Sequence, residues 1–141
     1  MKIKIKKISR EAVVPFCHHK GDAGFDLYSA ETIVLGPGER AKVRTGIAME
    51  VPNGYAGLIW DKSGIAANYG VKTMAGVVDS CYRGEICVVL VNLSDKNFKI
   101  ENKQKIAQIL IQKIESPKVE IVEGLSDSER GESGFGSTGD F

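Results

Sequence analysis

Short apolar stretches separated by turn-forming residues run along most of the chain. Six of these stretches alternate apolar with polar residues or are rich in β-branched residues, which is typical of β-strands. They are residues 2–6, 32–35, 41–51, 56–60, 76–78 and 85–92. The segments between them carry Gly, Pro, Asn and Asp, as in Gly36-Pro37-Gly38 and Pro52-Asn53-Gly54. Closely spaced strands without long helices predict a sandwich or a barrel.

A helix is predicted at only one place, residues 63–69. Ser63 is a possible N-cap, and Gly70 is suited to end the helix in a left-handed conformation. The chain is therefore expected to be all-β with one short helix.

Residues 103–114 fit either a helix or a strand. Ile106, Ile109 and Leu110 follow helical spacing, whereas 109–111 form an apolar run typical of a buried strand, with a further apolar-rich stretch at 118–122. A strand is favoured because the neighbouring segments are all predicted strands.

The overall charge and length limit the classes of function. The 141 residues suit one domain, and 19 Lys and Arg against 18 Asp and Glu give a net charge of +1. That balance excludes a whole-surface electrostatic footprint for nucleic acid or an anionic membrane. No apolar run approaches the roughly 20 residues of a membrane helix, and the N-terminus has no signal-peptide pattern. We expect a cytoplasmic protein without nucleic-acid or membrane partners.

The last part of the chain differs in composition from the rest. From Gly124 onward it is rich in Ser, Asp, Glu and Gly, with few large apolar residues. Such a segment cannot bury itself. We expect a β-barrel catalytic domain at 1–124 and a flexible C-terminal tail at 125–141.

The three cysteines do not form a metal or disulfide pattern. Cys87 lies in an apolar run and is expected to be a buried small hydrophobe, whereas Cys17 and Cys81 lie in loop-like contexts and are expected to be free thiols. Cys17 is followed by His18 and His19, so a metal site is conceivable, but the sequence contains no second ligand cluster.

Five short segments join glycine to polar or charged residues in a way that a plain β-domain does not require. They read AGFDL at 23–27, DKSGIA at 61–66, GVVDSCYRGE at 76–85, QKIAQ at 104–108 and RGESGFGSTG at 130–139. The last segment combines glycines, whose N–H groups form anion-binding concavities, with a guanidinium, two hydroxyls and an aromatic ring. It matches neither the P-loop nor the dinucleotide pattern, and a disordered Gly/Ser tail is the alternative.

The second and third segments also allow two interpretations each. Lys62, Ser63 and Gly64 suit a phosphate at a helix N-terminus, or a capped surface turn. Asp79 follows apolar residues and is either a general base or a carboxylate that satisfies turn N–H groups. Tyr82 in the same turn either lies against a sugar or covers the core.

The five segments in this order resemble the five motifs of the trimeric dUTPases, the deoxyuridine triphosphate nucleotidohydrolases. The family motifs read approximately AGxDL, RSGLA, GVIDxDYRGE, (R/K)IAQ and RGxGGFGSTG, and the resemblance extends from about residue 23 to residue 139. It implies a jelly-roll-like β-barrel homotrimer whose three active sites lie between subunits, with the C-terminal tail of one chain closing over a site built by others. The implied reaction is Mg²⁺-assisted hydrolysis of dUTP to dUMP and pyrophosphate, which limits uracil incorporation into DNA and supplies dUMP for thymidylate synthesis.

The resemblance also implies roles for individual residues. Asp79 corresponds to the base that activates the water attacking the α-phosphorus, and Asp26 to a supporting carboxylate. The substrate-binding positions are Lys62, Ser63, Gly64, Thr73, Gly76, Tyr82, Gln108, Arg130, Phe135, Gly136, Ser137 and Thr138. Tyr82 would pack on deoxyribose, the backbone near Thr73 and Gly76 would bind the uracil edges, and Phe135 would cover uracil. No protein cage for a metal is expected, because the substrate phosphates would hold most of the Mg²⁺ coordination.

Three positions depart from the family motifs. Lys62 stands where Arg is usual, which replaces a bidentate fork by a point charge. Cys81 replaces a common Asp, and Ser133 replaces a glycine of the tail.

Two rival functions remain open from the sequence. A dCTP deaminase has a related scaffold, but the Glu that its chemistry needs aligns with Val89 here, which leaves no proton shuttle. A non-catalytic nucleotide-binding β-domain is the second rival, and Asp79 together with an intact tail motif argues against it.

Overall fold

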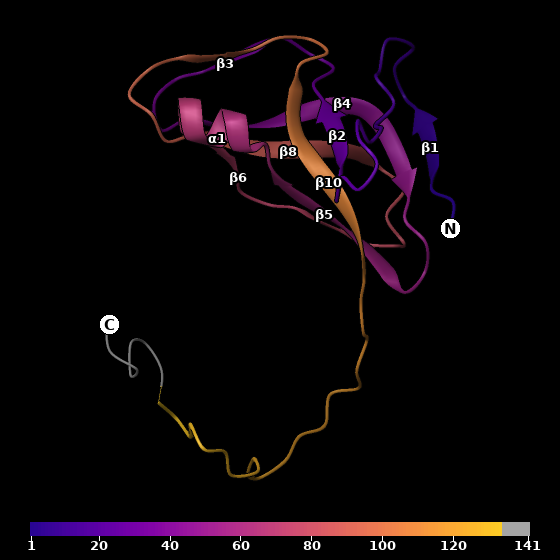
Figure 1. The fold of residues 1–141 in the computed structure, drawn as a ribbon, viewed down its shortest axis with the longest axis vertical. Coiled ribbons are helices and arrows are strands. Elements are labelled where there is room, and N and C mark those ends of the chain that lie inside the picture. Colours follow the sequence, from indigo (N-terminus) through magenta and orange to yellow (C-terminus); the bar gives the residue numbers. More distant parts are fainter. Residues whose placement is uncertain (134–141) are drawn as a thin grey trace.

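The computed structural model describes residues 1–133, and these form an all-β, jelly-roll-like fold with one short helix (Figure 1). The elements are β1 (Lys4–Lys7), β2 (Phe25–Tyr28), β3 (Ile33–Leu35), β4 (Arg40–Glu50), β5 (Tyr55–Asp61), α1 (Ser63–Tyr69), β6 (Val71–Thr73), β7 (Val77–Val78), β8 (Glu85–Asn92), β9 (Phe98–Ile100) and β10 (Lys105–Lys113). The fold class predicted from the sequence is confirmed.

The strands form two four-stranded antiparallel sheets and a two-stranded ribbon. One sheet has the order β1-β4-β8-β6, the other has the order β2-β10-β5-β7, and β3 pairs with β9. These are three separate hydrogen-bonded sheets rather than one closed barrel. The second sheet matters most for the site because it places the AGFDL, DKSGIA and KIAQ segments next to one another.

The core lies between the two larger sheets and follows from the alternation of the sequence. In β8 every second residue is buried, so that Ile86, Val88 and Leu90 point inward and are at most 1% exposed. Side chains from the second sheet, such as Leu27 and Ile109, meet them in the same cluster. The period of two residues along each strand accounts for this packing.

A bulge in β4 sets the register with which the start of β8 pairs with it. The register between the two strands shifts between Arg44 and Ala48, and Gly46 within the bulge has a φ of 69°. The Gly46 N–H donates to Glu85 Oε1 at 2.8 Å, while Arg44 Nε donates to Glu85 Oε2 at 3.1 Å. A Cβ on Gly46 would lie 2.9 Å from the Cβ of Ala12, so glycine is required here on two grounds.

The helix and most strands lie where the sequence predicts them, with a few differences. The helix spans the predicted residues and ends at Gly70, which has a φ of 65°. The N-cap, however, is Lys62 rather than Ser63, because the Lys62 carbonyl already accepts the N–H groups of Ile65 and Ala66 at 3.0 and 2.9 Å.

The ambiguous segment at 103–114 is the strand β10, as favoured. Strands β2, β6 and β9 were not predicted, because each has only three or four residues. Residues 118–122 form no strand, and Val119 and Ile121 are more than 90% exposed.

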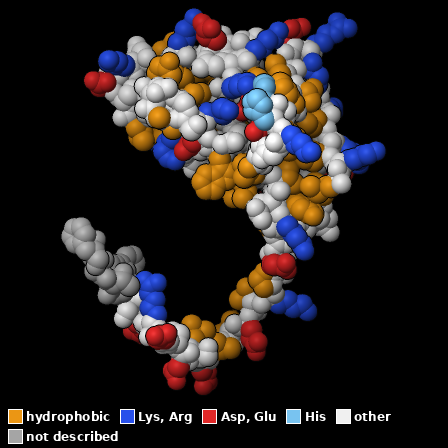
Figure 2. Space-filling model, viewed as in Figure 1, with side chains coloured by type: hydrophobic (Ala, Val, Ile, Leu, Met, Phe, Trp, Pro, Cys, Tyr) orange, Lys and Arg blue, Asp and Glu red, His pale blue; other side chains and the backbone are white. Residues whose placement is uncertain are grey.

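After β10 the chain leaves the sheets and runs away from them without forming a helix or strand up to residue 133 (Figure 1). Acidic side chains gather along this segment in Figure 2. The division into 1–124 and 125–141 stays a prediction. Among the described residues, no helix has the length and apolarity needed to cross a bilayer.

Candidate active site

A pocket of about 270 Å³ lies beside the turn that connects β7 to β8. Gly76, Asp79 and Tyr82, three of the residues predicted for the site, line it together. Asp79 follows the buried Val78 at the end of β7 and is exposed, and its backbone carbonyl accepts the Tyr82 N–H at 3.1 Å. Within residues 1–133 its carboxylate has no hydrogen-bond partner. The turn therefore presents an open carboxylate to the pocket.

Two glycines shape this pocket. The Gly76 carbonyl accepts the Ile59 N–H at 2.7 Å, and a Cβ on Gly76 would lie only 2.6 Å from the Ile59 carbonyl oxygen. A Cβ on Gly84 would overlap the ring of Tyr82, whose hydroxyl donates to the Glu85 carbonyl at 3.0 Å. Close packing against bare backbone thus sets the positions of both the β7 approach and the tyrosine.

Thr73 lies at the end of β6, outside the pocket that contains Asp79. Its N–H and its hydroxyl both donate to Asp61 Oδ1, at 2.5 and 2.7 Å, and Lys72 Nζ contacts Asp61 Oδ2 at 3.2 Å. Burial alone would raise the pKa of Asp61, but the hydrogen bonds from Thr73 and Lys72 outweigh it and lower the pKa. Asp61 thus fixes the segment that leads into the β7 turn.

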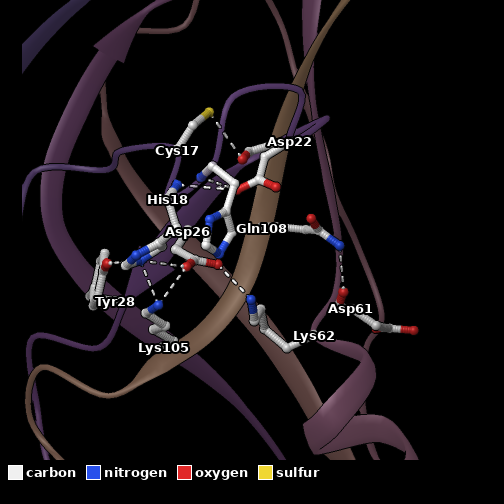
Figure 3. Close-up of polar contacts among 11 residues, drawn as sticks. Cys17, His18, Asp22, Asp26, Tyr28, Asp61, Lys62, Lys105 and Gln108 are labelled. Atoms are coloured by element: carbon white, nitrogen blue, oxygen red, sulfur yellow. Dashed lines mark hydrogen bonds and ion pairs between the residues drawn. The ribbon is translucent and has the colours of Figure 1, made fainter.

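A second group of predicted residues lies around the buried carboxylate of Asp26 on β2 (Figure 3). Asp26 Oδ1 accepts a hydrogen bond from Lys62 Nζ at 2.7 Å, and Oδ2 lies 3.0 Å from Lys105 Nζ and 3.2 Å from His18 Nε2. We call His18, Asp26, Lys62 and Lys105 the Asp26 cluster. They line a second pocket, of about 410 Å³, together with Gln108.

The charges of the cluster keep Asp26 ionised. Burial by itself raises the pKa of this carboxyl, and the hydrogen bonds and positive charges of Lys62 and Lys105 more than offset that effect, so the pKa lies below its usual value. The same environment raises the pKa of Tyr28, through burial and the nearby Asp26 charge. The pocket therefore contains two ammonium groups facing one carboxylate.

Ser63, Gly64 and Gln108 border the Asp26 cluster. Ser63 and Gly64 are exposed in the first turn of α1, and the space beside Gly64 is open. Gln108 Nε2 donates to the Asp61 carbonyl at 3.0 Å (Figure 3), which holds the amide of β10 against the end of β5. Of these three residues, Gln108 lines the same pocket as Lys62.

The tail contributes only one described site residue. Arg130 lies in a turn where its Nε donates to the Ser133 carbonyl at 2.8 Å, and the structure does not bring it to either pocket. Phe135, Gly136, Ser137 and Thr138 lie outside the described residues.

Six of the predicted residues thus line two separate pockets of one chain: Gly76, Asp79 and Tyr82 line the first, and Asp26, Lys62 and Gln108 line the second. Ser63, Gly64, Thr73 and Arg130 line neither. Sequence reasoning assigned no role to Asp61, Lys105 and His18, although the first two lie inside the quoted motifs. Asp61 adjoins Lys62 and Lys105 begins the KIAQ motif, whereas His18 stood out only as a neighbour of Cys17 and His19.

The cysteines differ from expectation at one position. Cys17 and Cys81 are exposed free thiols, as predicted. Cys87 is only half-buried because it lines the pocket beside Asp79. Burial, followed by the charge of Glu85, raises the pKa of the Cys87 thiol. Within residues 1–133, no three His, Cys, Asp or Glu side chains gather closely enough to hold a metal ion.

Comparison with known families identifies the family to which this fold belongs. The family described as dUTPase matches residues 10–139. The chain belongs to the dUTPase family. It is a dUTP diphosphatase, an enzyme that hydrolyses dUTP.

Individual relatives match this dUTPase over nearly its whole length. A deoxyuridine 5'-triphosphate nucleotidohydrolase of Nautilia profundicola is 45% identical over 141 residues, covering 99% of each chain. One of Clostridioides difficile is 43% identical over 139 residues, covering 97% of each. The dUTPase of Staphylococcus bacteriophage 80alpha, solved with dUpNHpp, superposes with a TM-score of 0.93 at 33% identity, covering 98% of each chain.

A further solved relative is a dUTPase variant from phage phi11 of S. aureus, described as showing the coordination of a structural Mg(II) ion. It superposes with a TM-score of 0.85 at 27% identity, covering 90% of this chain and all of the other. The AGFDL, DKSGIA, GVVDSCYRGE and KIAQ segments of this dUTPase all lie at the two pockets described above.

Proposed function

We propose that this enzyme converts dUTP to dUMP and pyrophosphate by attack of water on the α-phosphorus, with Asp79 as the general base. The reaction limits uracil incorporation into DNA and supplies dUMP for thymidylate synthesis. The observation that carries the proposal is the free Asp79 carboxylate, which lines a pocket together with Tyr82 and Gly76.

The surroundings of Asp79 suit a base. Its carboxylate is solvent-accessible and has no partner among residues 1–133, so it is free to accept a proton from a bound water. The hydrogen bond from the Tyr82 N–H to the Asp79 carbonyl at 3.1 Å closes the turn and fixes the backbone from which the Asp79 side chain leaves. A positioned base of this kind accelerates a reaction by about 10² to 10⁴.

The same pocket accounts for the choice of a deoxyuridine nucleotide. Gly76 lets the backbone of the β7 approach pack directly against Ile59, where a Cβ would lie 2.6 Å from the carbonyl oxygen. This packing holds the backbone at the edge of the pocket, where its polar groups would meet the uracil edges. The Tyr82 ring, placed by its hydrogen bond to Glu85, forms a flat wall for deoxyribose that a 2′-hydroxyl would meet. Val89 lines the pocket where a deaminase would need a carboxylate, which disfavours dCTP deamination.

The Asp26 cluster suits the triphosphate. Lys62, Ser63, Gly64 and Gln108 present an ammonium, a hydroxyl, open backbone and an amide on one side of the chain, and Asp26 orients Lys62. Arg130, Phe135, Gly136, Ser137 and Thr138 would complete the site from the tail.

Mg²⁺ fits this arrangement as an ion held mainly by the substrate phosphates, because the Asp26 carboxylate already faces Lys62, Lys105 and His18. When bound there, Mg²⁺ would neutralise phosphate charge during the reaction.

A homotrimer with sites between subunits would bring the two pockets together. On one chain, Asp79 and Lys62 line different pockets, so neither pocket contains both the base and the phosphate-binding group. Trp60, Met74 and Val77 are each more than half exposed beside these pockets, which leaves apolar surface for a neighbouring subunit. We propose that the tail of one chain closes over a site formed by the others.

The test is turnover with Mg²⁺ of dUTP against UTP, dTTP and dCTP, together with Asp79→Asn. We expect dUTP to be strongly preferred, with dUMP and pyrophosphate as products. The variant should keep its melting temperature and bind dUTP within several-fold, while kcat falls by about 10² to 10⁴. Comparable turnover of UTP or dTTP, or a variant that retains more than about a third of the activity, would refute the proposal.

A further inference from the structure

His18 lies between two charged groups that share one carboxylate oxygen. Its Nε2 is 2.5 Å from Lys105 Nζ and 3.2 Å from Asp26 Oδ2, and Lys105 Nζ is itself 3.0 Å from that same oxygen (Figure 3). The hydroxyl of Tyr28 is 3.5 Å from the same imidazole nitrogen. Three groups therefore converge on one nitrogen atom of His18.

The Nε2 atom of His18 has one possible partner of each kind. A lysine ammonium only donates hydrogen bonds, so Nε2 can accept from Lys105 when the imidazole proton is on Nδ1, whereas a proton on Nε2 can be donated to Asp26 Oδ2. A second proton on His18 would turn Nε2 into a donor facing the ammonium. Asp26 Oδ2 would then be its nearest charged partner, and Lys105 would be displaced from both.

We propose that His18 is a positioning residue whose proton decides whether Lys105 stays on Asp26 or is released to the triphosphate. This inference rests on the proposed role of the Asp26 cluster in phosphate binding. Histidine is the side chain that ordinarily changes charge near neutral pH.

The charges that face His18 set the sign of the effect. Asp22 lies on its own loop and accepts the backbone N–H groups of His18 and His19 at 3.1 and 2.8 Å. Asp26 and Tyr28 face it from β2, Lys105 from β10, and Lys62 lies on the far oxygen of Asp26.

With neutral His18, the positive charges of the two lysines in this pocket equal in number the negative charges of its two aspartates, Asp22 and Asp26. A proton on His18 adds one positive charge and frees one ammonium. Triphosphate binding should therefore strengthen as the pH falls. The rate of the chemical step at Asp79, in the other pocket, should not depend on the protonation of His18.

His18→Gln separates the effect of the proton from that of the hydrogen bond. The glutamine oxygen can accept from Lys105, but the side chain cannot gain a charge near neutral pH. We expect the KM of this variant for dUTP to equal that of the wild type at pH 8.5 and to exceed it about two- to fivefold at pH 5.5. The kcat ratio of the two proteins should stay constant. Titration of the substrate phosphates affects both proteins equally and cancels in the ratio.

The matched control is His19→Gln, one residue along the same loop, which should keep the wild-type KM profile. Equal pH profiles for wild type and His18→Gln, or a difference confined to kcat, would overturn the inference. So would the same loss of pH dependence in His19→Gln.

A binding measurement separates this inference from the proposed reaction. We would measure the Kd of inorganic triphosphate by calorimetry at pH 8.5 and 5.5 for wild type and His18→Gln. The Kd ratio should change in the same direction and by a similar factor as the KM ratio. An unchanged Kd ratio would overturn the role of His18 even if dUTP is hydrolysed as proposed, whereas failure of dUTP turnover with a shifting Kd ratio would overturn only the reaction.

Discussion

The carboxylate of Asp61 holds Thr73 by two hydrogen bonds to one oxygen, from the backbone N–H at 2.5 Å and from the hydroxyl at 2.7 Å. Asp61 ends β5 and precedes Lys62, whereas Thr73 ends β6 and leads to the turn that carries Asp79. A single side chain thus connects the phosphate-binding segment to the segment that bears the proposed base.

Replacing Asp61 should change how stability depends on pH. The pKa of Asp61 is lowered in the folded protein, so its contribution is complete above the usual Asp value of 3.8 and is lost as the pH falls through the lowered folded value. Asp61→Asn should therefore be less stable at pH 6 and should lose less stability than the wild type between pH 5 and pH 2.5. Urea unfolding at a series of pH values measures this, and parallel curves for the two proteins would contradict it.

Lys62→Arg should be tolerated and should keep or lower the KM for dUTP. The ammonium of Lys62 now reaches Asp26 at 2.7 Å with a single point of contact. A guanidinium has several donors in a fork, so it can hold Asp26 and a phosphate oxygen at once. Steady-state kinetics should show kcat within about threefold of wild type. A large loss would mean that the pocket is shaped around lysine.

Lys72→Arg is the matched control for Lys62→Arg. It is the same change on a lysine that pairs with Asp61 at 3.2 Å and lines neither pocket of the proposed site. We expect it to leave the KM unchanged.

Gly84→Ala should weaken the discrimination between deoxyribose and ribose. A Cβ at this position overlaps the Tyr82 ring, so the ring must move away from its hydrogen bond to Glu85. We expect kcat/KM for dUTP to fall and the ratio of dUTP to UTP turnover to drop about tenfold, the scale of a lost packing contact. Gly124→Ala, where a Cβ meets open space, should change neither quantity. If Gly84→Ala kept the wild-type selectivity for dUTP over UTP, Tyr82 would have no role in sugar recognition.

Deleting the chain after Leu125 should abolish most turnover while leaving the melting temperature nearly unchanged. The deleted segment has too little apolar surface to support the core, yet it carries Arg130 and the glycine-rich motif. Turnover, a melting curve and light scattering on one preparation test this. Full activity would make the tail a linker, and dissociation of the oligomer would make it structural.

Much of the fold follows from local patterns in the sequence. The β-branched residues of β8 predicted a strand with the bounds that the structure has. Gly70 marked the end of α1 because a left-handed residue is needed there and glycine adopts it without strain. In contrast, β2 and β9 are short, and the pairing partners that make them strands lie far away in the sequence, such as Ile109 for Phe25.

The motifs named candidate site residues but not how these residues contact one another. The motifs indicated Asp26 and Lys62, but their contact depends on the registers of β2 and β5 against β10. The same registers bring Lys105 to Asp26, and a loop of irregular backbone brings His18. No local pattern encodes these long-range placements, so Lys105 and His18 were not assigned roles from the sequence.

The location of Asp79 and Lys62 in different pockets has a genetic consequence. If each working site takes its base from one subunit and its phosphate-binding lysine from another, two inactive chains with different lesions can compensate for each other. Mixed oligomers of an Asp79→Asn chain and a Lys62→Gln chain would then contain some sites in which both groups are intact. Two alleles that each fail alone would complement when co-expressed, whereas a protein with self-contained sites would stay inactive.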